Sequence, residues 1–253
     1  MEVSERHRRI IEEARGSGRV EVKGLCATLG VSVETVRRDL RLLEQHGLLQ
    51  RTHGGAYPVE NAAYESALSE RGGPLLDSKQ RIARAAVGLL ADASSIFLDE
   101  GVTPVVIASM LPTDRKLTVL TASLPVAMEV AGKPDITLIV LGGRVRANTL
   151  GAVGSATTGM LNRFVVDLAY IGANGVSRGH GLTTPDPAVA DVKAQAIRSS
   201  RRRILFGVHE KFGIDSFCRF GDIKDFEAIV TDDGLALPLA RQLGELGPQV
   251  LRV

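Results

Sequence analysis

The chain has 253 residues, of which 44% are hydrophobic and 24% are charged, and its formal net charge is +2. This length and composition are typical of a two-domain globular protein and exclude a disordered or fibrous chain. The sequence has no run of eighteen apolar residues and starts with a charged segment. It therefore predicts neither a membrane-spanning helix nor a signal peptide, and we expect a cytoplasmic protein without membrane contact.

The excess positive charge is concentrated near the N-terminus. Residues 1–57 hold ten Lys or Arg and eight Asp or Glu, whereas residues 58–253 hold 21 of each. Within the first segment, four arginines fall between positions 37 and 51. A local basic patch of this kind indicates either a solvated helix face or a contact with nucleic acid.

The cysteine content argues against disulfide bonds and structural metal sites. Cys26 and Cys218 fall in different expected domains, and neither has a second ligand at metal-binding spacing. We therefore expect buried, reduced thiols rather than a disulfide, with no metal site and no cofactor.

The first sixty residues have the periodicity of a helix-turn-helix. Apolar spacing predicts helices at about 4–15, 22–29 and 33–46. Gly30 ends the second helix, Ser32 is placed to cap the third, and Gly47 ends the third. Two helices joined by three or four residues form the helix-turn-helix pattern.

The third expected helix has an apolar and a polar face. The apolar stripe, expected to pack on the first two helices, consists of Val33, Val36, Leu40 and Leu43. The residues expected to contact DNA here are Ser32, Glu34, Thr35, Arg37, Arg38 and Arg41. Arginine can pair bidentately with guanine, and threonine can contact a thymine methyl group or a phosphate. This surface is therefore suited to the major groove of double-stranded DNA.

Residues 48–56 read as a short strand, a Gly-Gly turn and the start of a returning strand. This pattern predicts either a wing that contacts DNA or a plain hairpin that covers the helix ends. In a wing, Arg51 and His53 would lie against phosphate or the minor groove.

The segment VSVETVRRDL at 31–40, followed by RTHGGA at 51–56, resembles the signature of the DeoR/GlpR family of bacterial regulators. The resemblance implies that residues 1–57 form a winged helix-turn-helix domain that binds an operator. Within this signature, Asp39 is interpreted as an ion-pair partner that orients Arg37 or Arg38.

A linker is expected at 58–75 and a larger α/β domain at 76–253. Residues 58–75 mix Pro, Gly, Ser and charged residues without sustained periodicity. After an amphipathic helix at about 78–91, the expected strands are 95–99, 117–121, 136–141, 168–171, 203–208 and 228–231. The helices expected between and after them are 104–111, 124–130, 153–161, 186–200 and 235–246. This alternation predicts a mostly parallel sheet with helices on both faces.

Glycines and polar residues follow the expected strands, where ligands of such sheets bind. Hydroxyl and amide groups at helix starts can hold an anion while a carboxylate accepts hydrogen bonds from sugar hydroxyls, although any one loop could instead be an ordinary turn. The candidate effector-binding residues are Asp99, Gly101, Thr103, Thr121, Ser123, Gly142, Gly143, Arg146, Asn174, Asp186, Lys193 and Lys211. The arginines at 201–203 are interpreted as a solvated helix end close to this site.

From about Ser78 to Asp232 the chain resembles the sensor domain of the same family, which is related to ribose-5-phosphate isomerase. The segments that carry this resemblance are GANG at 172–175, GLTTPD at 181–186 and KFG at 211–213. The resemblance implies a phosphorylated sugar as effector. Glu100, Val102 and Ala122 depart from the family pattern, and an added carboxylate and a lost hydroxyl would weaken an anion site.

Three functions follow from these observations. The leading hypothesis is a non-enzymatic repressor of a carbohydrate or related catabolic operon that acts as a homodimer or homotetramer and loses operator affinity when a metabolite binds. An alternative is an active sugar-phosphate isomerase with an added DNA-binding module, in which Asp99, Glu100, Asp186 and Lys193 supply a base and an anion clamp. A third is an interaction scaffold whose winged helix contacts protein.

Overall fold

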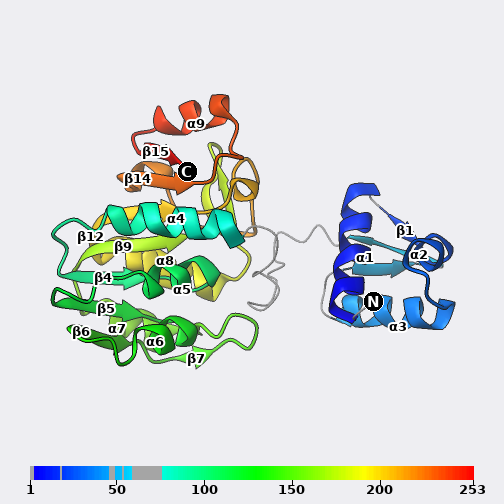
Figure 1. Cartoon of the computed structure of the whole chain (residues 1–253), viewed down its shortest axis with the longest axis horizontal. Coiled ribbons are helices and arrows are strands. Elements are labelled where there is room, and N and C mark those ends of the chain that lie inside the picture. The colour runs from blue at the N-terminus through cyan, green and yellow to red at the C-terminus, as the bar shows by residue number, and fades with distance from the viewer. Residues whose placement is uncertain (1–2, 18, 46–48, 53, 59–75) are drawn as a thin grey trace. The chain divides into compact units, whose positions relative to one another are not determined.

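The chain forms two compact units, Met1–Tyr64 and Glu65–Val253. The computed structural model in Figure 1 describes all residues except 1–2, 18, 46–48, 53 and 59–75. The linker predicted at 58–75 therefore lies outside the described residues, apart from Pro58 at the end of a strand. The smaller unit has one hydrophobic core, and the larger has a core on each face of its main sheet.

The smaller unit packs its helices against a short antiparallel sheet whose strand order is β1-β3-β2. Its elements are α1 (Val3–Ser17), β1 (Val20–Glu21), α2 (Val22–Leu29), α3 (Val33–Gln45), β2 (Leu49–Thr52) and β3 (Gly55–Pro58). The helices and the β2–β3 hairpin confirm the helix-turn-helix and hairpin predicted from the sequence. The two-residue strand β1 was not predicted, because so short a segment has no usable periodicity.

The turn between α2 and α3 is set by its own residues. Gly30 ends α2 in the left-handed conformation, at φ 66°. Ser32 then starts α3, since its Oγ accepts a hydrogen bond from the Thr35 amide at 3.2 Å. These two positions fix the angle at which α3 leaves the turn.

The apolar stripe of α3 is shorter than predicted. Val36, Leu40 and Leu43 are at most 2% exposed and join the core of the unit. Val33 is 42% exposed, so its predicted packing is wrong. Val33 is the first residue of α3, and at this end of the helix the apolar stripe continues beyond the hydrophobic core of the unit.

The larger unit is built on a parallel sheet, which confirms the predicted fold class. Among the described residues, this sheet has seven strands in the order β15-β14-β12-β9-β4-β5-β6. Their bounds are β4 (Ser95–Leu98), β5 (Leu117–Thr121), β6 (Ile136–Val140), β9 (Val166–Gly172), β12 (Ser200–Phe206), β14 (Ala228–Thr231) and β15 (Gln249–Arg252). Strand β15 was not predicted, and it pairs with β14 at one edge.

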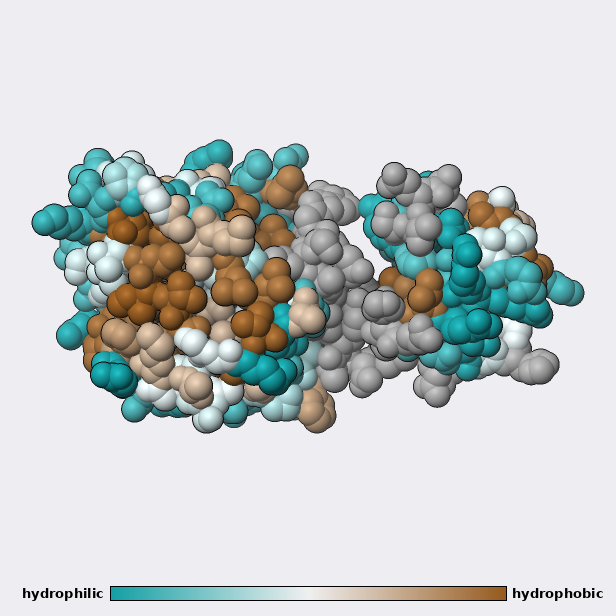
Figure 2. All heavy atoms as spheres, turned by 90° about the horizontal axis from the view of Figure 1, so that it is seen from below, coloured by the Kyte–Doolittle hydropathy of each residue, from teal (hydrophilic) through white to brown (hydrophobic). Residues whose placement is uncertain are grey.

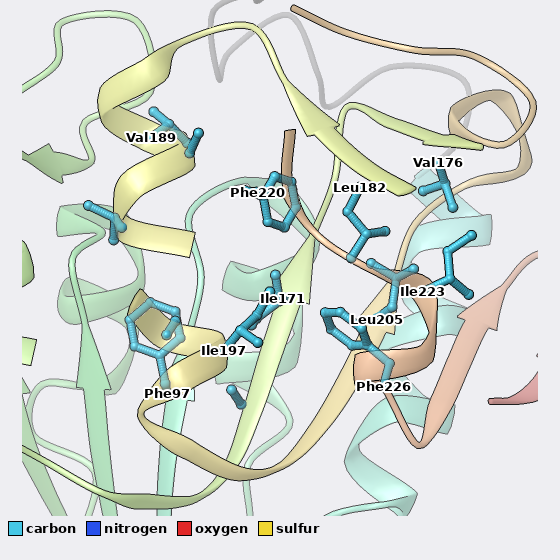
Figure 3. Packing of buried hydrophobic residues seen from close by; sticks show 14 of the residues in the cluster. Phe97, Ile171, Val176, Leu182, Val189, Ile197, Leu205, Phe220, Ile223 and Phe226 are labelled. Carbon is cyan, nitrogen blue, oxygen red and sulfur yellow. The ribbon is translucent and has the colours of Figure 1, made fainter. Parts of the chain in front are cut away.

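Helices cover both faces of this sheet. On one face, buried residues of α4 (Leu76–Gly88), α5 (Val102–Ser109) and α6 (Leu124–Val130) share a core with the sheet. On the other face, α7 (Ser155–Leu161), α8 (Pro187–Arg198) and α9 (Leu237–Gly244) share a second core. Figure 3 shows this second core, where Phe97 and Ile171 of the sheet lie near Ile197 of α8, and Val189 lies farther along the same helix. Alternate strand residues thus enter opposite cores.

Short strands and turns complete the second core. An antiparallel sheet comprises β10 (Gly175–Ser177), β11 (Gly181–Thr184) and β13 (Cys218–Gly221), and a ribbon comprises β7 (Arg144–Val145) and β8 (Ala152–Val153). Two 3-10 turns, η2 (His209–Lys211) and η3 (Ile223–Asp225), follow β12 and β13. These strands were not predicted because segments of two to four residues carry too little periodicity.

The three arginines at 201–203 form part of β12, so their prediction as a helix end is wrong. Arg202 pairs with Glu227 at 2.7 Å, and Arg203 Nε donates to the Asp225 carbonyl at 2.5 Å. Both side chains brace the amino-terminal half of β12. These arginines lie at the opposite end of β12 from the candidate effector residues Asp99 and Lys193.

The sequence predicted no membrane-spanning helix and two buried, reduced thiols. In the part of the chain that the structure describes, no helix has both the length and the apolar content needed to cross a bilayer. Cys26 and Cys218 are free thiols, as expected, but both are half-buried rather than buried.

Candidate nucleic-acid interface and effector site

The exposed face of α3 is basic. Arg37, Arg38 and Arg41 are all exposed on this helix. Arg37 lies 3.4 Å from Glu34, and their side chains are 58% and 85% exposed. A pair this exposed is weakly held and can exchange for a phosphate or a base edge. The face therefore presents several guanidinium groups that are free to reorient.

Two hydroxyl groups lie at the start of this helix. Ser32 Oγ, besides capping α3, lies 2.9 Å from Thr35 Oγ1. Both residues were predicted to contact DNA. In the structure, Ser32 orients the N-terminal turn of α3, which is the part of a recognition helix that meets base edges.

The β2–β3 hairpin is tied to α3 through Glu44. Its carboxylate accepts a hydrogen bond from the Arg51 amide at 3.0 Å and lies 3.5 Å from the Arg51 guanidinium. Arg51 is exposed beside α3, as a wing contact requires. His53, the other predicted wing residue, lies outside the described residues.

Asp39 lies on the inner side of α3, and its predicted pairing with Arg37 or Arg38 is wrong. Its carboxylate accepts hydrogen bonds from Arg6 Nε at 2.5 Å and Arg6 Nη2 at 3.0 Å. His7 Nε2 lies 3.0 Å from the same carboxylate. Burial alone would raise the pKa of Asp39, but the hydrogen bonds from Arg6 and His7 outweigh it and lower that pKa. Asp39 thus joins α3 to α1 instead of orienting a DNA contact.

The centre of the larger unit holds a buried ion pair at the carboxyl ends of the strands. Asp99 follows β4 and is 3% exposed, and Lys193 of α8 is 4% exposed. Lys193 Nζ donates to Asp99 Oδ2 and, at 3.1 Å, to the Gly172 carbonyl. Asp99 also accepts hydrogen bonds from the Gly172 and Glu100 amides, at 2.8 and 2.9 Å. One carboxylate thus links β4, β9 and α8.

A second charged group surrounds Arg146, which lies in the turn between β7 and β8. Its guanidinium is 3.3 Å from Glu100 and 3.1 Å from Asp186, and its side chain is 8% exposed. Thr149 Oγ1 donates to Glu100 Oε2 at 3.0 Å. Asp186 also caps α8 by accepting a hydrogen bond from the Ala188 amide. The predicted residues Arg146 and Asp186 therefore meet, together with Glu100 and Thr149.

The hydroxyl residues after β4 and β5 hold the turns in place. Thr121 Oγ1 donates to the Leu98 carbonyl at 2.8 Å and accepts from the Ser123 amide at 3.0 Å. Ser123 caps α6 through the Val126 amide. Thr103 is buried in the first turn of α5. These contacts give Thr121 and Ser123 a structural task besides any contact with a ligand.

The glycines in these loops allow close approach. Gly101 has φ 122°, and Gly143 has φ 151°. A Cβ at Gly143 would lie 2.0 Å from Thr157 Oγ1, which in turn donates to the Gly142 carbonyl at 2.7 Å. Gly142 and Gly143 therefore seat the loop on α7.

The remaining predicted residues lie at the same edge of the sheet. Asn174 follows β9, and its Oδ1 accepts a hydrogen bond from Thr184 at 3.0 Å. Lys211 ends the turn η2, which follows β12. Within the described residues, no group of three or more His, Cys, Asp or Glu side chains could hold a metal ion.

A further buried contact at this edge, between Asp232 and His209, was not predicted from the sequence. Asp232 follows β14 and accepts hydrogen bonds from the amide and the imidazole Nδ1 of His209, at 2.6 and 2.5 Å. Burial would raise the pKa of Asp232, but these hydrogen bonds outweigh it and lower that pKa. An available signal was that Asp232, like Asp99, is a carboxylate directly after a buried strand.

Comparisons with known proteins identify both units. The DeoR-like helix-turn-helix domain matches residues 6–61, and the DeoR C terminal sensor domain matches residues 76–233. The chain is 32% identical to the HTH-type transcriptional regulator GlpR of Haloferax volcanii, over 98% of this chain and 97% of that one. It is 31% identical to the glycerol-3-phosphate regulon repressor of Escherichia coli, over 92% of each.

A solved structure of ribose 5-phosphate isomerase A from Methanocaldococcus jannaschii has a TM-score of 0.40, with 18% identity and 55% of each chain covered. The two family matches and the full-length relatives lead to one conclusion. The chain belongs to the DeoR family of DNA-binding transcription regulators and carries the sensor domain of that family.

Proposed function

We propose that the chain represses a carbohydrate or related catabolic operon, and that a small metabolite lowers its affinity for operator DNA. The effector is a phosphorylated sugar or polyol that binds at the carboxyl edge of the main sheet. The observation that carries this proposal is the buried polar cluster at that edge. Its charged residues come from three parts of the fold: Asp99 follows β4, Lys193 lies on α8, and Arg146 lies in the β7–β8 turn.

In the proposed complex with DNA, α3 enters the major groove. Arg37, Arg38 and Arg41 contact bases or phosphates, while Arg51 and His53 hold the hairpin against the DNA backbone. The exposure of these arginines supports this assignment. Residues 1–57 thus act as the DNA-binding domain, in the cytoplasm where the operator lies.

In the proposed effector complex, residues 76–253 act as the sensor. Asp99 accepts hydrogen bonds from ligand hydroxyls, and Lys193 and Arg146 supply positive charge to an anionic group. Each of these groups already bridges separate elements, so a ligand that changes their pairing also changes how β4, α8 and the β7–β8 turn meet. We expect the linker at 58–75 to transmit this change to the DNA-binding domain.

We further propose that the regulator is a homo-oligomer and that a second copy covers the surface formed by α6, β6 and the β7–β8 region. Large apolar side chains are exposed there: Leu124, Met128, Val140, Val145 and Leu150. Figure 2 shows hydrophobic residues gathered on one face of the larger unit. The edge strand β6 adds unpaired backbone groups, and edges of this kind are normally covered. Two copies also suit the paired half-sites of helix-turn-helix operators.

The sensor is proposed to bind its ligand without turning it over. Asp99, the residue that would serve as a general base in an isomerase, already accepts hydrogen bonds from Lys193, the Gly172 amide and the Glu100 amide. A substrate proton would have to compete with these three donors for the carboxylate oxygens. The geometry therefore favours the sensor over the isomerase alternative.

The test is operator binding by the full-length chain, with duplexes selected from a random pool and a panel of sugar phosphates and polyol phosphates. At least one compound should release the operator. Lys193→Met should keep operator binding but lose that release, whereas the exposed control Lys224→Met should keep both. Operator binding that is indifferent to every compound would overturn the proposed effector class.

A further inference from the structure

Arg146, a proposed cation for the effector's anionic group, is already held by carboxylates of its own chain. Glu100 Oε1 lies 3.3 Å from its Nη1, and Asp186 Oδ2 lies 3.1 Å from its Nε. Arg146 Nη1 also donates to Thr149 Oγ1, which donates onward to Glu100 Oε2. The side chains of Glu100 and Arg146 are each 8% exposed. The Glu100 carboxylate thus lies where the anionic group of a ligand would bind Arg146.

The opposite side of Glu100 is shaped by Gly151. An ideal Cβ at position 151 would lie 1.7 Å from Glu100 Oε2, so a side chain at that position would force the Glu100 carboxylate to move. The φ angle of Gly151 lies outside the left-handed region, so its backbone does not require glycine. Glycine at position 151 instead leaves the space that the Glu100 carboxylate occupies. Glu100 and Gly151 are therefore fitted to one another, although they lie 51 positions apart in the chain.

The charges at this edge oppose the simple addition of an anion. Asp99, Glu100 and Asp186 are acidic, whereas Lys193 and Arg146 are basic and already pair with them. A phosphate that approached Arg146 would meet two carboxylates within contact distance of the same guanidinium. Like charges at this range repel strongly in a buried setting.

We propose that Glu100 is a built-in anion that occupies the Arg146 site, and that an anionic effector binds only by displacing it. This proposal rests on the proposed function and adds a regulatory step to it. Glu100 directly precedes Gly101, the residue that caps the start of α5, while Arg146 and Thr149, which it contacts, lie in the β7–β8 turn. Replacing Glu100 by a ligand anion therefore frees the start of α5 from that turn, and this rearrangement is the one that the effector selects.

The test uses the full-length chain with inorganic phosphate, glycerol 3-phosphate and neutral glycerol as probes, measured by titration calorimetry. Glu100→Gln removes the competing charge, and Gly151→Ala keeps the charge but expels the side chain. Each variant should bind glycerol 3-phosphate roughly tenfold or more tightly than the wild type, since a like charge no longer opposes it. Binding of glycerol should change much less. The exposed control Glu245→Gln should match the wild type.

The double variant Glu100→Ala/Gly151→Ala separates displacement from other effects. If Gly151→Ala acts by expelling Glu100, adding it to Glu100→Ala should bring no further gain. Far-UV circular dichroism and thermal midpoints confirm that each variant folds.

The role of Glu100 would be overturned if both single variants bound glycerol 3-phosphate no more tightly than the wild type. It would also be overturned if neither the wild type nor any variant bound a phosphate ester. Release of the operator by some other metabolite would, in that case, leave ligand-controlled repression intact. A different result would overturn the coupling between effector binding and operator binding. In that case both variants would bind phosphate esters more tightly, but no compound would change operator binding.

Discussion

Arg6 of the first helix and Asp39 of the third form a bidentate ion pair inside the DNA-binding unit, with side chains 7% and 1% exposed. The pair is buried on the side of α3 that faces α1, directly behind the exposed arginines. It therefore fixes the orientation in which α3 presents Arg38 and Arg41, although neither Arg6 nor Asp39 contacts the solvent face.

Replacing Asp39 by Asn should destabilise the DNA-binding unit by about 3 kcal/mol, because Arg6 would be left without a buried charge partner. Hydrogen exchange of the full-length chain should show about a hundredfold faster exchange in α1 and α3 peptides, with the sensor unchanged. The matched control is Glu12→Gln, since the exposed Arg8–Glu12 pair at 3.8 Å contributes less than about 0.5 kcal/mol. Similar protection in both variants would contradict this role.

The same pair predicts acid sensitivity. The pKa of Asp39 is lowered in the folded chain, so its stabilisation is complete above the unfolded pKa of about 4 and is lost as the pH falls through the lower folded value. Protection of α1 and α3 should therefore decline below about pH 4 in the wild type. The decline should be smaller in Asp39→Asn, which carries no charge there to lose.

Arg38→Ala and Arg41→Ala should each weaken operator binding by about 1–3 kcal/mol, or roughly 5- to 150-fold, if each arginine contacts a base. Fluorescence anisotropy with a selected operator measures this loss. Arg201→Ala, an exposed arginine of the sensor, is the control and should change affinity less than about twofold. Unchanged affinity in both α3 variants would support the scaffold alternative, in which the winged helix contacts protein.

Asp232→Asn should lower the stability of the sensor by about 1–3 kcal/mol at pH 7, because the His209 amide and imidazole would lose a charged acceptor. The pKa of Asp232 is lowered by folding, so this difference should shrink as the pH falls below about 4. Thermal unfolding at pH 7 and pH 3 measures both effects. The control Asp233→Asn alters a neighbouring side chain that is 77% exposed and should have little effect at either pH.

Met128→Glu should break the proposed oligomer, because Met128 of α6 is 79% exposed and belongs to the proposed apolar interface. Light scattering should show a smaller particle than the wild type, and operator affinity should fall with it. Phe217→Glu alters a side chain that is 65% exposed in the loop before β13, so it should leave the assembly intact. A wild-type chain that is already monomeric would refute the interface.

Sequence patterns were most informative where local physics decides the structure. The bounds of α2 follow from apolar spacing and the stop at Gly30, and the turn into α3 follows from the Ser32 cap. The alternation of apolar runs and helices likewise predicted the parallel sheet and placed Asp99 directly after β4.

Contacts between distant segments could not be predicted in this way. Asp39 pairs with Arg6, 33 positions away, rather than with a neighbour on its own helix. Asp99 and Lys193 were both candidates, but their pairing spans 94 positions and depends on how α8 packs across the sheet. The fit between Glu100 and Gly151 depends on the β7–β8 ribbon, whose two-residue strands leave no periodic signal.

The most direct test of ligand-controlled DNA binding is a measurement of effector affinity with and without saturating operator. Once the panel has identified a compound that releases DNA, linkage requires that the operator weaken binding of that compound by the same factor, typically about 5- to 150-fold. We expect this equality for the wild type and its loss in Lys193→Met. An effector affinity that is the same with and without operator would contradict this expectation.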